Sequence, residues 1–131
     1  MRRLLIATGL AFVLLAASAA VSTPTYAAPP ADACPAYYLC FWKDTHYSGP
    51  WHNFYYCGFD RLSNNYWSGA FVDSVNNDAS SLVNNQTSGT ISVFWDDILG
   101  GGPSFQQHSY GYRDNLVIDG WNDRISRVLV C

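Results

Sequence analysis

The sequence predicts an all-β domain, a sandwich or barrel of about eight short strands. From Pro35 onward, short runs rich in β-branched and aromatic residues alternate with Gly, Pro, Asn, Asp and Ser, as is typical of strands and turns. No segment past residue 30 keeps an apolar period of 3.6 residues over three turns. A segment beginning at Phe41 also recurs at Phe94, which indicates a domain built from two similar halves.

The candidate strands follow one another along the chain with turn residues between them. Each has five to nine residues, and one loose helical turn is expected at most, over 61–67. The predicted strands are 37–42, 51–57, 69–75, 80–85, 90–95, 104–112, 115–119 and 125–131.

Two pairs of segments make up the internal repeat. The first pair, offset by 53 residues, matches at five of ten positions: Phe41/Phe94, Trp42/Trp95, Asp44/Asp97, Gly49/Gly102 and Pro50/Pro103. The second pair, offset by 46, matches at Asp73/Asp119, Asn76/Asn122 and Ser80/Ser126. The second half is therefore seven residues shorter between its two segments. Two copies of a four-strand unit can bury their apolar faces against each other, so we expect two walls around one core.

Residues 1–28 have the pattern of a secretory signal peptide. Arg2 and Arg3 precede an apolar run, 4–21, and small residues follow, with Ala27 or Ala28 as the last residue removed. The alternative is a retained membrane anchor, which the borderline length and the polar interruptions of the run disfavour. We expect a secreted, extracellular protein with one domain, 29–131, and no membrane contact once the signal peptide is removed.

The composition restricts the classes of function. The ten acidic residues are all Asp, against seven basic residues, and removing Arg2 and Arg3 brings the net charge near −5. Such a surface does not favour a nucleic acid partner. The chain also lacks a G-x-S-x-G nucleophile elbow and a Gly-rich phosphate loop, and Asp96 and Asp97 face opposite sides of a strand. We therefore predict that the protein is not an enzyme.

The cysteines agree with export. Cys34, Cys40, Cys57 and Cys131 form an even set in a small domain, which predicts two disulfides. Three pairings are possible. Cys34–Cys40 together with Cys57–Cys131 is preferred here, and Cys40–Cys57 across a hairpin is the main alternative.

Two motifs resemble the βγ-crystallin Greek key. Trp42, Tyr47 and Gly49 have the spacing of its aromatic corner, where Gly accepts a positive φ at little cost. The stretch 76–81 is similar to its calcium signature, Asn/Asp-Asn/Asp-x-x-Ser/Thr-Ser. The resemblance implies a sandwich of two Greek-key motifs, about 34–85 and about 88–131.

The same resemblance implies a set of calcium ligands. One closing motif would supply Asn76, Asn77 and Ser81, and the other would supply Asn122, Asp123 and Ser126. The hairpin of the opposite half would complete each site and bring in Asp44 and Asp97. The competing interpretation is that the Asn and Ser side chains only cap turns. Arg127 stands where the signature has a second Ser and disfavours a cation there. No cofactor is required on this interpretation, and calcium would be structural.

A narrower resemblance spans almost the whole chain after the signal peptide. The stretches CPAYYLCFWKDTHYSG, NNDASSLVNNQT and NDRISRVLVC are together similar to the secreted bacterial peptidase inhibitors of family I36. The resemblance implies an inhibitor whose partner is an extracellular protease, with metalloproteases the best-known targets. We expect the protein to be a monomer. Cys131 is the only cysteine of the second half, so the cysteine-stapled reactive loop of the metalloprotease inhibitors is missing.

The candidate inhibitory loop lies in the second half, and its three glycines predict flexibility, so a plain hairpin turn is the competing interpretation. Its residues are Ile98, Leu99, Gly100, Gly101, Gly102 and Pro103. The segment 84–89 between the halves is a second candidate. The alternative function is a calcium-stabilised binding module for cell-wall carbohydrate, using Tyr pairs such as 37–38 and 55–56, or a toxin-like effector.

Overall fold

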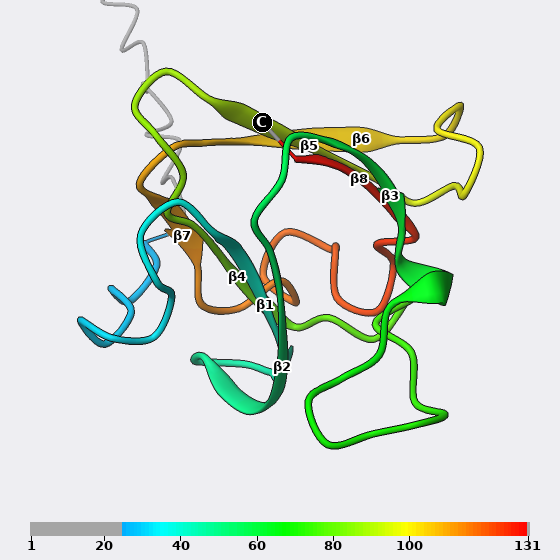
Figure 1. Cartoon of the computed structure of the whole chain (residues 1–131), viewed down its shortest axis with the longest axis horizontal. Coiled ribbons are helices and arrows are strands. Elements are labelled where there is room, and N and C mark those ends of the chain that lie inside the picture. Colours follow the sequence, from blue (N-terminus) through cyan, green and yellow to red (C-terminus); the bar gives the residue numbers. More distant parts are fainter. Residues whose placement is uncertain (1–24, 131) are drawn as a thin grey trace, which may run out of the picture.

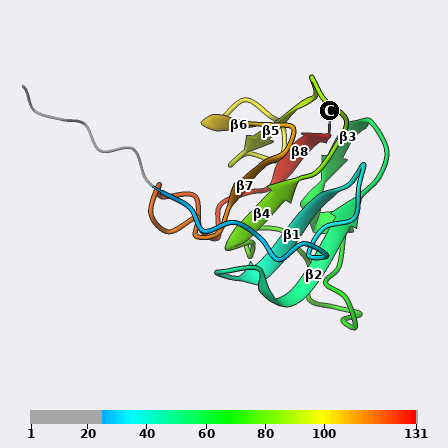
Figure 2. The same cartoon turned by 90° about the vertical axis from the view of Figure 1, so that its left-hand side faces the viewer.

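The computed structural model describes residues 25–130, which form two four-stranded antiparallel sheets (Figures 1 and 2). Most of the predicted signal peptide lies outside these residues. The elements are β1 Leu39–Asp44, β2 Ser48–Phe54, β3 Gly58–Arg61, the 3-10 turn η1 Leu62–Asn64, β4 Ser81–Asn84, β5 Ile91–Trp95, β6 Ser104–His108, β7 Gly111–Arg113 and β8 Arg127–Val130. The predicted all-β class, the number of strands and the helical turn are confirmed for the described residues.

The two halves of the chain exchange one strand each between the sheets. Their orders are β2-β1-β4-β7 and β3-β8-β5-β6. The first sheet takes three strands from the first half and β7 from the second, and the second sheet takes β3 from the first half in return. This is the topology of two interlocked Greek-key motifs, and it confirms the predicted sandwich.

Backbone hydrogen bonds repeat between the halves at the offsets seen in the sequence. The amide of Ser80 donates to the carbonyl of Trp42 at 3.0 Å, and that of Ser126 donates to Trp95 at 2.8 Å. The amides of Leu62 and Leu116 donate to the opposite half, to the carbonyls of Ser126 and Ser80 at 3.0 and 2.9 Å. The repeat is therefore a pseudo-twofold relationship in space.

The core between the sheets is aromatic at its centre. Phe41 and Phe94 are equivalent positions of the repeat. Their rings pack edge to face with centroids 5.8 Å apart, and both side chains are fully buried. Phe54 packs on Phe41 at 5.9 Å, and Phe105 stacks on Phe94 at 4.6 Å. Burial of each such side chain stabilises the fold by roughly 1.5–3 kcal/mol.

The first sheet is also covered on its outer face. β4 is buried along its whole length, because the N-terminal segment packs over it. The Cys34–Cys40 disulfide, with Cα atoms 5.8 Å apart, ties that segment to β1. This confirms the preferred local pairing and excludes Cys40–Cys57. Cys57 is also disulfide-bonded, and its predicted partner, Cys131, lies outside the described residues.

Two of the predicted strands are wrong, because they do not form in the structure. The run 69–75 is a loop with one isolated bridge between Tyr66 and Ser74, because the apolar tip of this loop packs on nothing. The run 115–119 forms turns instead, since the side-chain oxygen of Asn115 accepts the amide of Val117 at 3.0 Å.

The remaining errors concern β3, β6 and β7. The run 104–112 is split into β6 and β7, which lie in different sheets, and the chain turns between them at Tyr110 with φ of 62°. β3 was not predicted, because two of its four residues are charged and its apolar alternation is too short to detect.

Candidate functional site

The two closing motifs lie side by side across the pseudo-twofold axis. The amide of Asn77 donates to the carbonyl of Ile125 at 3.0 Å, and the equivalent amide of Asp123 donates to Ala79 at 3.3 Å. Asn77 and Asp123 both have φ of 54°, a conformation that Asn and Asp tolerate better than most residues. The Ser126 hydroxyl donates to the Asn77 side-chain oxygen at 2.6 Å, so the two motifs also touch through side chains.

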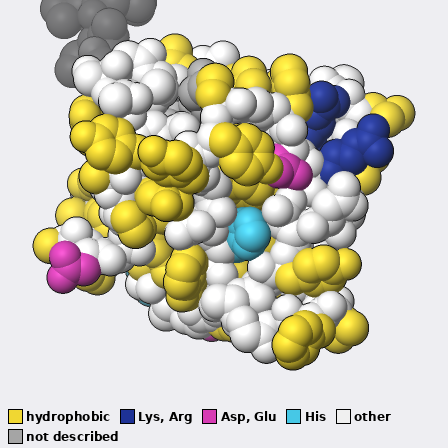
Figure 3. Space-filling model, viewed as in Figure 1, with side chains coloured by type: hydrophobic (Ala, Val, Ile, Leu, Met, Phe, Trp, Pro, Cys, Tyr) yellow, Lys and Arg dark blue, Asp and Glu magenta, His cyan; other side chains and the backbone are white. Residues whose placement is uncertain are grey.

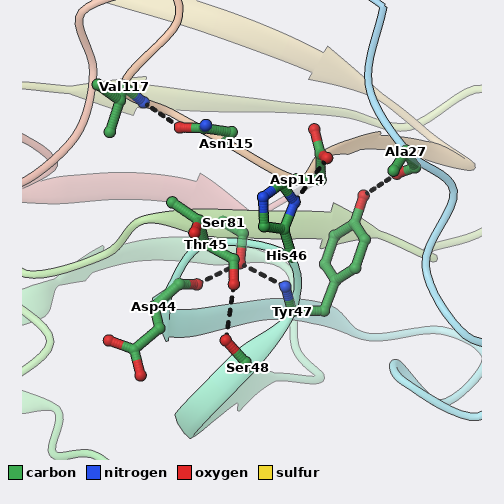
Figure 4. Close-up of polar contacts among 10 residues, drawn as sticks. All are labelled: Ala27, Asp44, Thr45, His46, Tyr47, Ser48, Ser81, Asp114, Asn115 and Val117. Carbon is green, nitrogen blue, oxygen red and sulfur yellow. Dashed lines mark hydrogen bonds and ion pairs between the residues drawn. The ribbon is translucent and has the colours of Figure 1, made fainter.

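Ser81 joins its motif to the hairpin of its own half. Its hydroxyl donates to the carbonyl of Asp44 at 2.7 Å and accepts the amide of Tyr47 at 3.1 Å (Figure 4). The expectation was that each closing motif would meet the hairpin of the opposite half. The geometry of Ser81 differs because β1 and β4 are neighbours in one sheet, which brings residue 81 under the β1–β2 turn.

The oxygen atoms of the first closing motif suit a calcium ion, whereas those of the second motif do not. The side-chain oxygens of the equivalent residues Asn76 and Asn122 are buried and accept no hydrogen bond. Amide, hydroxyl and backbone oxygens of this kind are ligands that calcium accepts. In the second motif, however, Arg127 replaces the Ser81 hydroxyl, and a guanidinium beside the site opposes a cation.

An ion pair beside each closing motif appears in both halves with its charges reversed. The Lys43 ammonium lies 2.9 Å from Asp78 in the first half. At the equivalent positions of the second half, Asp96 accepts from Arg124 at 2.5 Å. The pKa of Asp123 is raised by burial and then by the nearby Asp78 carboxylate.

The predicted inhibitory loop 98–103 forms the turn between β5 and β6. Leu99 is 71% exposed and Ile98 37%. Asp97 accepts the Leu99 amide through its carboxylate at 2.9 Å and the Gly100 amide through its carbonyl at 2.9 Å. Arg127 donates to the Leu99 carbonyl at 2.7 Å. Asp97 therefore holds the start of this turn, Leu99 and Gly100, and Arg127 holds it from the other side.

A second loop, 68–73, was not predicted as a functional segment and is called the Phe71 loop below. It projects at the lower right of Figure 1, and hydrophobic side chains stand out at the same corner in Figure 3. Phe71 is 94% exposed and Val72 92%, more than any other large apolar side chain among the described residues. The signal in the sequence was the seven extra residues of the first half.

Tyrosines gather around a shallow pocket at the opposite end of β1 and β2. The pocket is lined by Tyr37, Tyr55, Cys57, Gln86, Thr87 and Thr90. Tyr55 and Tyr56 are both exposed, because they follow the end of β2 and no longer alternate across a sheet. Tyr55 is braced by Tyr38, with ring centroids 5.0 Å apart. The segment 84–89 therefore borders an aromatic surface.

His46 connects the first hairpin to the second half. Its amide donates to the Asp114 carbonyl at 2.6 Å, and its Nδ1 lies 2.9 Å from the Asp114 carboxylate (Figure 4). Tyr47 packs edge-to-face on Trp42 at 5.5 Å, and Gly49 has φ of 74°, as the aromatic corner requires. A Cβ at Gly49 would lie 2.2 Å from the Asp44 carboxylate, and the positive φ would strain any other residue there.

Two described residues of the predicted signal peptide contact the domain. The Tyr26 hydroxyl donates to Asp119 at 3.0 Å, and the Ala27 carbonyl accepts from the Tyr47 hydroxyl at 2.6 Å. Cleavage after Ala27 or Ala28 would remove both contacts. Within residues 25–130, no helix is long and apolar enough to cross a membrane.

Solved structures with this arrangement of strands are βγ-crystallin domains. One comes from work on the evolution of the eye-lens βγ-crystallin domain fold, with TM-score 0.58, 18% identity, and coverage of 75% of this chain and 89% of that one. A βγ-crystallin from Ciona intestinalis has TM-score 0.52, 19% identity, and coverage of 72% and 99%. A domain from Flavobacterium johnsoniae has TM-score 0.53, 26% identity, and coverage of 71% and 92%. The fold is therefore that of the βγ-crystallins.

Within that fold, the sequence itself defines a narrower group. Residues 27–106 match peptidase inhibitor family I36, and the chain belongs to that family. The matched range contains the whole first half and the β5–β6 turn. No curated protein matches the chain at the significance required.

Proposed function

We propose that this protein is a secreted inhibitor that blocks an extracellular protease by binding a surface loop in the enzyme's cleft. Membership of peptidase inhibitor family I36 is the observation that carries the proposal. Metalloproteases are the first targets to test, because they are the best-known targets of the resembling inhibitors. The protein acts as a monomer and needs no cofactor for this activity.

The mechanism is non-covalent and depends on preorganisation. A loop held in its bound conformation loses little entropy when it enters a cleft, so more of the contact energy appears as affinity. The β-sandwich supports this role, because two sheets around one aromatic core hold the loops at fixed positions. No chemical step on the inhibitor is required.

Protease titration tests the proposal. The mature protein should abolish the activity of at least one secreted protease in a 1:1 ratio, using a panel of thermolysin-like metalloproteases and subtilisin-like and chymotrypsin-like serine proteases. A lack of inhibition across the panel at micromolar excess would remove the proposal.

We also propose a structural calcium ion at the first closing motif. The buried, unpartnered oxygen of Asn76 supports it, and the Asn77 and Ser81 oxygens lie in the same motif. The second motif is not a site on this proposal, because of Arg127. Calcium that binds only the folded protein should raise its melting temperature relative to EDTA. An Asn76→Leu variant should lose that increase, and Asn122→Leu should keep it.

The tyrosine pocket supports a second candidate function, binding of cell-wall carbohydrate. Exposed Tyr37 and Tyr55 flank the pocket and offer ring faces to a sugar, while Thr87 and Thr90 offer hydroxyl groups. Pull-down on peptidoglycan, chitin and glucan tests it. Tyr55→Ala should release the bound protein from the matrix, whereas Tyr66→Ala, a change of another exposed tyrosine, should not.

A further inference from the structure

The Phe71 loop presents two adjacent large apolar side chains to solvent. Exposing so much apolar surface at a loop tip costs free energy, since burial of either side chain would be favourable. Val117 and Ile118, in the corresponding segment of the second half, are 58% and 56% exposed. The first half has seven residues more than the second between its two repeated segments, and the Phe71 loop lies in that longer stretch.

The base of the Phe71 loop is held by hydrogen bonds to β2 and across its own neck. The Ser68 amide donates to the Trp51 carbonyl at 2.9 Å, and the Trp51 amide donates to the Ser68 hydroxyl at 3.1 Å. The Trp67 amide donates to the Asp73 carbonyl at 3.1 Å and closes the neck. The two ends of the loop are thus fixed, and Phe71 and Val72 at its tip face solvent.

Side chains beneath the loop reinforce this arrangement. The Trp67 side chain is 1% exposed, and its indole N–H donates to Asp78 at 2.9 Å. The Lys43 ammonium lies 2.5 Å from Asp73, at the far end of the loop. A short, anchored, convex loop with apolar residues at its tip has the properties needed to enter a concave cleft at low entropic cost.

We infer that the Phe71 loop is the segment that enters the protease cleft, with Phe71 and Val72 filling apolar pockets that accept large side chains. This inference rests on the proposed inhibitory function and specifies the contact. It favours the Phe71 loop over 98–103, because Phe71 and Val72 are 94% and 92% exposed, against 37% for Ile98 and 71% for Leu99. The partner is then an extracellular protease that prefers bulky apolar residues beside the scissile bond.

The test compares three double variants with the wild-type protein on a protease that the wild type inhibits. Phe71→Ala/Val72→Ala removes the tip, and Val117→Ala/Ile118→Ala makes a matched change at an exposed apolar pair of the other half. Ile98→Ala/Leu99→Ala removes the apolar side chains of the rival loop. Melting temperatures establish that each variant is folded.

We expect the first variant to raise the inhibition constant at least about thirtyfold, because two buried apolar contacts are lost. The other two variants should stay within about threefold of wild type. Hydrogen exchange in the complex should show protection concentrated in 68–73. Inhibition by the wild type that survives the Phe71 and Val72 changes would overturn this inference and leave the proposed function standing. A wild type that inhibits no protease in the panel would remove both.

Discussion

The guanidinium of Arg127 occupies the space that a side chain at Gly100 would need. A Cβ built on Gly100 would lie 2.9 Å from its Nη1, and Gly100 has φ of 79°. At the equivalent positions of the first half stand Ser81 and Tyr47, whose aromatic ring packs on Trp42. The second half thus replaces an aromatic corner by an arginine that lies 4.5 Å from the Phe59 ring and 5.9 Å from the Trp95 ring.

This exchange predicts coupling between positions 100 and 127. Arg127→Ser should cost about 1–2 kcal/mol, because the Leu99 carbonyl loses its donor and two rings lose a cation–π contact. Gly100→Tyr should cost more, because the new side chain meets the guanidinium. The double variant should be more stable, by at least about 1 kcal/mol, than the summed effects of the two single substitutions predict. Urea denaturation of the four proteins measures this, and strict additivity would contradict it.

The Lys43 contacts predict a local effect on the Phe71 loop. Lys43→Ala removes the partner of Asp73 and should speed hydrogen exchange within 68–73, with little change in the global free energy of unfolding. Arg124→Ala is the matched control, because it breaks the equivalent ion pair in the half without a projecting loop. Equal exchange in 68–73 for both variants and wild type would show that the loop does not depend on Lys43.

Alkaline pH should destabilise the fold. Burial, followed by the nearby Asp114 carboxylate, raises the pKa of Tyr47, and hydrogen bonds to Asp73 and Asp78 raise the pKa of Lys43. A raised pKa in the folded state means that the unfolded chain loses these protons first. The stabilisation is therefore complete below about pH 10 and is lost as pH rises above it.

Tyr47→Phe should reduce that loss, because the phenol that titrates is gone. The measurement is the free energy of unfolding between pH 8 and pH 11, with Tyr110→Phe as a control at an exposed site. Identical pH profiles for wild type and Tyr47→Phe would show that Tyr47 contributes nothing to the loss of stability at alkaline pH.

Removing the Cys34–Cys40 disulfide should lower the stability of the protein clearly, although the disulfide closes only a short loop. Cys34→Ser/Cys40→Ser should lower the free energy of unfolding by about 2–3 kcal/mol, because the unfolded chain regains its freedom and the segment over β4 is released. Urea denaturation measures the change, and a loss below about 0.5 kcal/mol would show that packing alone holds the segment.

Much of the fold followed from local patterns in the sequence. The pairs Phe41/Phe94 and Ser80/Ser126 identified the repeat, and they occupy equivalent places because each half needs the same backbone contacts. The errors fell where tertiary contacts decide the structure. Val72 and Val117 lie in apolar runs that resemble strands, but no neighbouring strand is available to pair with them.

The candidate site was less predictable than the fold. Asn76 and Ser81 could be recognised from their motif. The sequence does not reveal that the Ser81 hydroxyl forms hydrogen bonds with the hairpin of its own half. The anchoring of the glycine turn depends on Arg127, which is distant in the chain. The exposure of Phe71 depends on the absence of any packing partner, which only the three-dimensional arrangement shows.

The exchange of β3 and β7 makes each half incomplete without the other. We expect neither half to be stable when expressed alone, because each would expose an unpaired sheet edge and its half of the core. Because each sheet is completed by a strand from the other half, we expect the two halves to unfold together in one cooperative transition.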